Sequence, residues 1–266
     1  MKTLLSTMSA ALLLVASAAQ AADMTTTPAT PAANPLTQPW TGPYGGVPPW
    51  DQVKVEFLKP ALEAGMADQL AAIDRIANDP ATPTFANTIA ALERSSRMLD
   101  RVYTVAGVYQ STMSDEAVQA VERDMAPKLA AFSDQITQNE KLFARIAAVY
   151  ATRENSGLTP EQQRLTWLYY TDFVRQGAKL DAAAKKQLSD INQQLAGLYT
   201  SFGQNVLKDE NDGMLVIDKE ADLAGLPAPV REGAAQDAES RGLKGKWVVA
   251  NTRSSVEPFL TYADRR

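Results

Sequence analysis

Apolar residues recur at intervals of three and four along most of this 266-residue chain, and that spacing restricts it to a mainly helical fold. An α-helix turns once in about 3.6 residues, so residues at these intervals share one face. The last such stripe predicts an amphipathic helix, and its residues would equally suit a seam between two helices. The stripe comprises Leu188, Ile191, Leu195, Leu198, Phe202 and Val206.

Proline and capping residues divide the first half of the pattern. We expect a helix from Trp50 to about Asn78, with Pro60 early in it, where a first turn tolerates proline. Thr84 is suited to cap a second helix, whose apolar positions continue to Tyr109. The chain before residue 110 is therefore predicted to hold two long helices.

Further caps predict four more helices before residue 207. Ser114 is expected to cap a third helix, which Pro127 should kink. Asn139 is expected to cap a short fourth helix, with Gly157 placed to stop it. Thr159 and Asp181 are expected to cap the last two of these helices. After Thr159, Pro160 is expected as the first helical residue and Gln162 as the capping-box partner.

The pattern changes after Val206, where residues 209–213 have the composition of a turn. Two short β-type runs at 214–217 and 247–250 alternate with helices expected at 226–240 and 257–264. The sequence thus predicts a mostly α fold with a small β element near 214–250. The expected divisions are a signal peptide over 1–21, a Thr/Pro-rich linker and extended arm over 22–49, a helical domain over 50–207 and a mixed α/β segment over 208–266.

Residues 1–21 have the parts of a secretory signal peptide. Lys2 supplies positive charge, residues 4–16 form a run that is mostly apolar, and small residues around Ala19 and Ala21 form a cleavage site. The apolar run is too short for a stable membrane span, and an uncleaved anchor is the alternative. We expect cleavage near Ala21 and a periplasmic or secreted protein with no membrane anchor.

The chain contains neither histidine nor cysteine. Structural zinc sites need these side chains and catalytic zinc sites nearly always use histidine, so no metal or cofactor is expected in this chain. Ser-His-Asp and Cys-His catalysis are excluded for the same reason. The net charge is −5 and no basic stripe is present, which argues against nucleic-acid binding. The basic segment 241–246 is expected to be a solvated loop.

Other candidate groups are expected to be structural. Asp209, Glu210 and Asp212 are acidic, but Gly213 falls where a calcium loop needs a ligand. The acid pairs at 115–116 and 220–222 are expected to serve helix starts rather than catalysis. No catalytic, cofactor-binding or metal-ligating residue is therefore assigned. Aromatic residues expected to pack the arm onto the helices, with a ligand platform as the alternative, are Trp40, Tyr44 and Trp50.

Six segments, in order along the chain, resemble one peptidase family. The segment PTFANTIAALER at 83–94 strongly resembles the N-terminal signature of the thimet oligopeptidase and peptidyl-dipeptidase family. The resemblance runs from about Asn34 to the last residue and fits the bacterial peptidyl-dipeptidase branch best, including exported forms. The other segments are KPALEAGM at 59–66, MAPKLAA at 125–131, NEKLFARI at 139–146, DFVRQGA at 172–178 and INQQLAGLYTSFGQNV at 191–206.

The resemblance implies the multi-helix N-terminal half of a two-lobed, channel-bearing zinc metallopeptidase. Such enzymes act on short unstructured peptides, and the peptidyl-dipeptidases release dipeptides from peptide C-termini. The family's zinc site is a His-Glu-x-x-His helix in the second half of the chain, and this sequence has no such motif. Zinc is therefore implied for the full-length enzyme and not for this chain, which we expect to stop before the catalytic region and to be inactive alone.

Two alternatives stay open at this point. One is a non-catalytic helical module that binds peptides or partners, and the other is one chain of a split enzyme. If the chain is a front portion, apolar surface that the rest would cover should be exposed. The expected positions are the outer residues of the 188–206 stripe and Phe259, Leu260 and Tyr262.

Overall fold

The computed structural model describes residues 33–265, and helices dominate this part of the chain. The expected signal peptide and residues 22–32 of the expected linker lie outside the described residues. The prediction of a mostly α fold with a small β element is confirmed. None of the helices in residues 33–265 combines the length and the apolar content that a membrane span needs.

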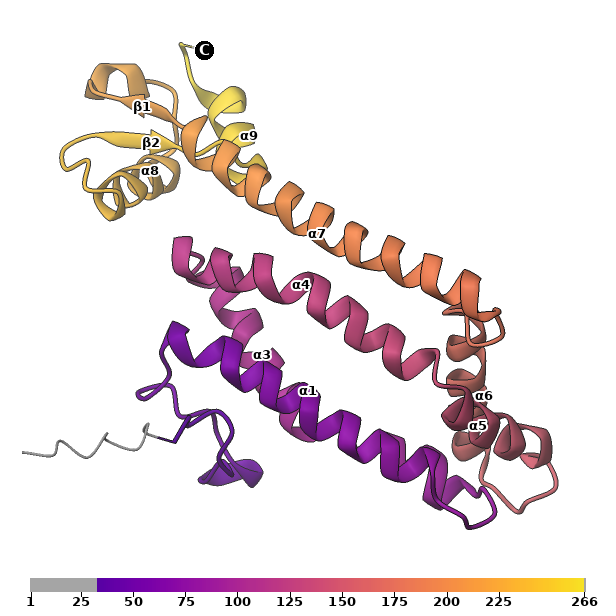
Figure 1. Ribbon diagram of the computed structural model, residues 1–266. Coiled ribbons are helices and arrows are strands. Elements are labelled where there is room, and N and C mark those ends of the chain that lie inside the picture. Colours follow the sequence, from indigo (N-terminus) through magenta and orange to yellow (C-terminus); the bar gives the residue numbers. More distant parts are fainter. Residues whose placement is uncertain (1–32, 266) are drawn as a thin grey trace, which may run out of the picture. The chain divides into compact units, whose positions relative to one another are not determined.

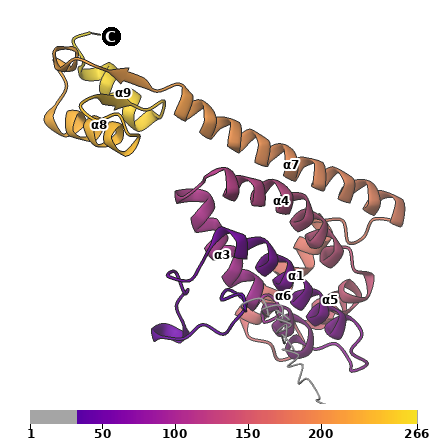
Figure 2. The ribbon, with the colours of Figure 1, turned by 60° about the vertical axis from the view of Figure 1, so that its left-hand side comes forward.

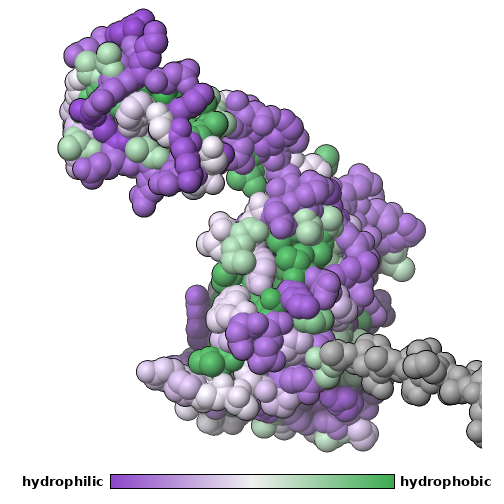
Figure 3. Space-filling model, turned by 90° about the vertical axis from the view of Figure 1, so that its left-hand side faces the viewer, coloured by the Kyte–Doolittle hydropathy of each residue, from purple (hydrophilic) through white to green (hydrophobic). Residues whose placement is uncertain are grey.

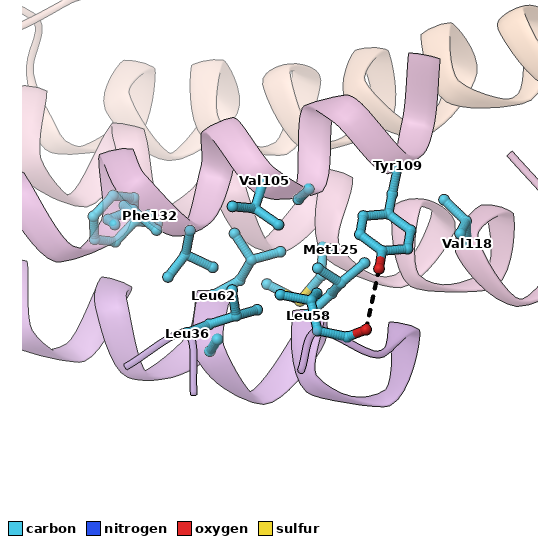
Figure 4. Close-up of a cluster of buried hydrophobic side chains, with 13 residues drawn as sticks. Leu36, Leu58, Leu62, Val105, Tyr109, Val118, Met125 and Phe132 are labelled. Carbon is cyan, nitrogen blue, oxygen red and sulfur yellow. Dashed lines mark hydrogen bonds between the residues drawn. The ribbon is translucent and has the colours of Figure 1, made fainter. Parts of the chain in front are cut away.

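Three helices surround the first hydrophobic core: α1 (Val55–Ala77), α3 (Arg97–Thr112) and α4 (Glu116–Thr137) (Figure 1). Figure 4 shows the side chains that meet between these helices. Their apolar faces follow the helical spacing of the sequence, so the core forms where the three stripes meet. Core residues with almost no exposed surface include Leu36, Leu58, Leu62, Val105, Val118 and Met125.

Two contacts fix α1 and α3 as antiparallel neighbours. The Tyr109 hydroxyl donates a hydrogen bond of 3.2 Å to the Val53 carbonyl (Figure 4). Further along, Gly65 lies against Leu99, and a Cβ atom at Gly65 would be 2.9 Å from the Leu99 Cα. Glycine therefore permits this close approach, because any side chain there would push the two helices apart.

A second core joins the C-terminal end of α1 to α5 (Glu140–Thr152) and α6 (Pro160–Arg175) (Figures 1 and 2). The π-helical turn η2 (Phe85–Ile89) and the short helix α2 (Ala90–Glu93) complete it. Its fully buried residues include Ile89, Leu142 and Ile146.

The long helix α7 (Ala182–Asp212) runs antiparallel along α4 (Figures 1 and 2). The order of their contacts shows this direction, because Asn192 pairs with Asp134 and the later Gln204 pairs with the earlier Gln119. This neighbour relation places α7 outside the first core, where it covers α4.

The C-terminal segment has its own small core. Strands β1 (Leu215–Ile217) and β2 (Trp247–Val249) pair antiparallel, with Val216 opposite Val248. The helical elements of the segment are η3 (Glu220–Leu223), α8 (Ala228–Ser240) and α9 (Arg253–Tyr262). The buried residues between them are Ile217, Leu223, Leu226, Val249 and Ala263.

The arm before α1 packs on the first core through only some of its apolar residues. Leu36 is fully buried, and the Arg101 guanidinium lies 5.0 Å from the Trp40 ring centroid. Tyr44, in the 3₁₀ turn η1 (Pro43–Gly45), is instead fully exposed, and Trp50 is nearly half exposed. The expectation that all three aromatic residues pack the arm is thus right for Trp40 and wrong for Tyr44.

Local capping signals place the helix starts well. Thr159 and Gln162 form the expected reciprocal capping box at the start of α6. Asn139 and Asp181 accept hydrogen bonds from the third residue of α5 and α7, as expected. In α4, however, the cap is Asp115, which accepts from the Val118 amide at 2.9 Å, and not Ser114. The one-residue error arises because adjacent serine and aspartate are both good caps.

Two longer helices break or end at places other than those expected. The helix expected from Thr84 to Tyr109 is broken near residues 94–96, where the buried Ser95 hydroxyl donates to the Leu92 carbonyl at 2.7 Å. The turn expected at 209–213 is instead the end of α7, which continues to Asp212 with Gly213 as its C-cap. An ion pair between Lys208 and Asp212 supports helical structure there.

Smaller differences concern prolines, a glycine and the last helix. Pro60 lies in the second turn of α1, and α4 continues through Pro127. Each proline removes only one helical N–H, which a helix held by core packing tolerates. Gly157 lies in the loop beyond α5, with a φ of 68°, so it shapes the loop rather than ending the helix. Helix α9 begins at Arg253, four residues before the expected Glu257.

We predict that Leu142→Ala lowers the free energy of unfolding by about 2–5 kcal/mol, because it opens a cavity in the second core. The measurement is urea unfolding followed by circular dichroism. The matched control is Leu198→Ala on the exposed side of α7, which should stay within about 0.5 kcal/mol of the unchanged protein. Equal losses in the two variants would contradict this assignment of the core.

Candidate functional site

The side of α7 that faces α4 consists of small and polar residues. The Asn192 amide donates to Asp134 Oδ1 at 2.7 Å, and the Gln204 amide donates to the Gln119 carbonyl at 3.1 Å and to Glu122 at 2.9 Å. Ala196 lies between these two points and lines the hollow beneath α7. Hydrogen bonds, rather than apolar packing, therefore attach α7 to the rest of the bundle.

A charged group anchors the start of the same helix. Lys185 is the one buried residue of α7, and its ammonium donates to the Gln138 carbonyl at 3.3 Å and to Glu140 at 3.2 Å. Asp134 is also buried, with Oδ2 lacking a partner among the described residues. Buried polar groups of this kind fix one arrangement of two helices, because leaving either partner unpaired is costly.

The apolar stripe of α7 faces away from α4 and is exposed. Leu198 is 65%, Tyr199 72% and Phe202 67% exposed. Burying one such side chain contributes about 1.5–3 kcal/mol to stability. These exposed side chains make no such contribution within the described part of the chain. The sequence-based expectation of exposed outer positions is confirmed for the stripe and, on α9, for Leu260 and Tyr262; the stripe residues concerned are Ile191, Leu195, Leu198, Phe202 and Val206. It is wrong for Phe259, which is partly buried because it packs against the small C-terminal core.

An apolar hollow of 290 Å³ lies between α3 and α4. Tyr103 of α3 stands at this hollow and is half exposed, while Met125 and Leu129 of α4 and Leu62 of α1 form its apolar lining. Figure 3 shows one face of the molecule, on which hydrophobic atoms gather in a central patch among hydrophilic residues. Contiguous apolar surface of this kind marks a surface that contacts something else.

Charges between α1 and α4 form an exposed network. Lys59 lies 2.6 Å from Asp124, and Lys128 lies 3.1 Å from both Asp124 and Glu63. Hydrogen bonds from Lys59 and then Lys128 hold the pKa of Asp124 below its usual value. Hydrogen bonds to Asp124 and Glu63 raise the pKa of Lys128. Because every member pairs with an opposite charge, the network joins the helices and carries no free charge for a ligand.

Tyr169, a partly buried residue of α6, has a strongly changed proton affinity. The Tyr169 hydroxyl donates to Glu93 Oε1 at 2.7 Å, and burial, together with this bond, raises the pKa of Tyr169. A raised tyrosine pKa keeps the phenol protonated at neutral pH, so it is not poised as a base. The contact ties α6 to α2 at the edge of the second core.

The acidic residues considered from the sequence have structural partners. Asp115 caps α4, and Glu116 pairs with Arg123 at 2.6 Å. Glu220 pairs with Arg231 at 2.8 Å and Asp222 with Arg265 at 2.5 Å. Across residues 33–265, no three His, Cys, Asp or Glu side chains gather where they would hold a metal ion.

The basic segment 241–246 is a loop, as expected, in which Arg241 pairs with Asp237 and Lys246 with Asp218. Within the described residues, the apolar side of α7 and the hollow between α3 and α4 are therefore two surfaces with exposed apolar groups. Sequence spacing located the stripe of α7, but spacing alone does not say which side of a helix meets its neighbour.

Comparison with known proteins identifies relatives of this chain. It is 35% identical to a dipeptidyl carboxypeptidase of Escherichia coli K12 over 227 residues, which are 85% of this chain and 33% of the relative. It is 33% identical to the dipeptidyl carboxypeptidase of Salmonella typhimurium over 88% of this chain and 34% of that protein. The chain is therefore a relative of the dipeptidyl carboxypeptidase and oligopeptidase A family.

Oligopeptidase A of Haemophilus influenzae is 27% identical over 83% of this chain and 32% of its own length. No family model matches the chain. The chain spans about a third of the length of these peptidases. What the comparisons establish is thus the peptidase family, and the resemblance first noted in the six sequence segments is confirmed.

We predict that Asn192→Ala loosens α7 from α4, because the buried Asp134 carboxylate then loses its amide donor. A buried acceptor without its partner costs about 1–3 kcal/mol. Hydrogen exchange should rise across residues 182–212, and proteases should cleave there sooner. Gln194→Ala, on the exposed side of the same helix, is the matched control. Unchanged exchange in Asn192→Ala would show that the hydrogen bond does not hold α7.

Proposed function

We propose that this chain is the helical portion of an exported zinc metallopeptidase that removes dipeptides from the C-termini of oligopeptides. The observation that carries the proposal is the graded similarity to the peptidases. Identity is 35% and 33% to two dipeptidyl carboxypeptidases and 27% to an oligopeptidase A, over similar shares of this chain. The proposed substrates are short unstructured peptides.

The residues of this chain do not fit a zinc site. It has no histidine and no cysteine, and the described part brings no suitable group of carboxylates together. Carboxylates alone compete poorly for zinc against imidazole and thiolate. In the proposed enzyme the metal ligands and the catalytic groups therefore come from residues outside this chain, and no chemical step is assigned to residues within it.

The proposed role of the chain is to build a rigid wall beside the peptide. Two packed cores and a capped set of helices supply that rigidity. The hollow between α3 and α4 offers apolar surface, with the Tyr103 ring at its edge. A non-catalytic peptide-binding module is the competing hypothesis, and the same surfaces would serve it. Activity in the presence of the rest of a peptidase distinguishes the two.

The activity is tested by replacing the matched 227 residues of the Escherichia coli dipeptidyl carboxypeptidase with this chain. We predict that this chimaera releases dipeptides from peptide C-termini and loses the activity when a chelator removes the metal. The isolated chain should release none, because it has no histidine to bind catalytic zinc. Metal content and dipeptide release are measured on both proteins. Metal-dependent turnover by the isolated chain, or a folded chimaera that loads zinc yet releases no dipeptide, would overturn the proposal.

Export is tested separately. Lys2, the apolar run 4–16 and the small residues before Ala22 support a signal peptide that is cleaved after Ala21. We predict that the protein recovered from the periplasm starts at Ala22, as read by intact-mass spectrometry. A variant with Leu12→Arg and Leu13→Arg should remain uncleaved in the cytoplasm, since charges interrupt the apolar run. Intact Met1 on the unchanged protein in the cytoplasm would contradict export.

A further inference from the structure

Helix α7 has three sides, and only one of them contacts other helices in the described part of this chain. The first side, with Asn192, Ala196 and Gln204, faces α4. The second side is polar and exposed, and includes Asp190, Gln194 and Ser201. The third side is exposed as well, yet its residues are Ile191, Leu195, Leu198, Tyr199, Phe202 and Val206.

The third side cannot be the one that folds onto this chain. The bonds of Asn192 and Gln204 are made on the α4 side, so turning the stripe toward α4 would break them. Turning it would also bring Leu198 and Phe202 against the polar groups around Asp134 and Glu122. The polar side of α7 therefore faces α4, where its hydrogen bonds are made, and the apolar stripe stays exposed.

The spacing of the stripe suits a helical partner. Steps of three and four from Leu188 to Phe202 match the repeat that packs one helix along another. At about 1.5 Å per residue the stripe from Leu188 to Val206 extends for roughly 27 Å, which is about five turns of a helix. The residues beside it, Gln187, Gln194 and Ser201, are uncharged, so an apolar partner meets no unpaired charge at the border.

The relatives supply the source of such a partner. The chain accounts for 33% of the Escherichia coli dipeptidyl carboxypeptidase, so about two thirds of that protein lies outside the match. We infer that the apolar side of α7 packs against an apolar helix from that unmatched part of the peptidase. This inference rests on the proposed function, since it takes the chain to be part of a longer enzyme.

The test uses the absence of cysteine from this chain, which allows a single introduced thiol to report on one position. Leu198→Cys is placed in the isolated chain and in the chimaera with the unmatched part of the Escherichia coli peptidase. The rate of thiol labelling at residue 198 is read by peptide mass spectrometry, which separates it from any other cysteine. Ser201→Cys, exposed on the polar side of α7, is the matched control.

We expect labelling at residue 198 to be at least about tenfold slower in the chimaera than in the isolated chain, because a buried thiol reacts only when the contact opens. Labelling at residue 201 should stay within about twofold between the two proteins. Equal labelling at residue 198 in both proteins would overturn the inference. Protection in the isolated chain that grows with its concentration would also overturn it, and would assign the surface to a second copy of the chain.

A second variant covers the case in which the chimaera does not fold. Leu198→Ser combined with Phe202→Ser in the isolated chain should leave its unfolding midpoint unchanged and reduce its binding of a hydrophobic dye. Loss of folding in this variant would show that the stripe belongs to the chain's own core, and would overturn the inference. Neither measurement reads peptidase activity, so an inactive but protected chimaera would reject the proposed function and leave the inference standing.

Discussion

The hydrogen bond between the buried Asp134 and Asn192 decides which side of α7 faces the rest of the molecule. A carboxylate removed from water needs a donor, and the amide of Asn192 is the donor that it has. With that contact made, and with Gln204 paired further along, α7 has no freedom to turn its leucines inward. The exposed stripe is thus a direct consequence of where the buried polar groups lie.

Apolar packing in the two cores and hydrogen bonding along α7 give these parts of the fold different local stabilities. The first and second cores are held by apolar side chains with almost no exposed surface, such as Leu62 and Leu142. Helix α7 adds one buried residue, Lys185, and its attachment depends on a small number of hydrogen bonds. Regions with few buried apolar contacts open more readily than the cores. We therefore regard α7 as the part of the helical bundle whose position depends most on contacts from outside it.

The sequence predicts the helices better than it predicts their contacts, for a physical reason. Caps such as Thr159 and Asp181 act within one turn, so they can be recognised from a few neighbouring residues. The break near Ser95 coincides with a buried hydroxyl bonded to the Leu92 carbonyl, and that burial is set by packing from other helices. Most of all, a stripe shows that a helix has an apolar side but not whether the chain itself supplies what covers it. Only the positions of Asp134 and Asn192 in three dimensions answer that question for α7.

A partner that binds the folded chain also stabilises it, because binding removes folded molecules from the unfolding equilibrium. If the stripe of α7 is covered in a longer peptidase, the covering segment is held at high effective concentration by the chain that connects them. Each apolar residue that it buries then adds to the stability of a helix whose attachment within this chain is polar. Helix α7 would be held on one side by specific hydrogen bonds, which set its orientation, and on the other by apolar packing, which supplies most of the free energy. The orientation set by Asp134 is what makes the second set of contacts available, so the polar contact and the apolar surface are two parts of one arrangement.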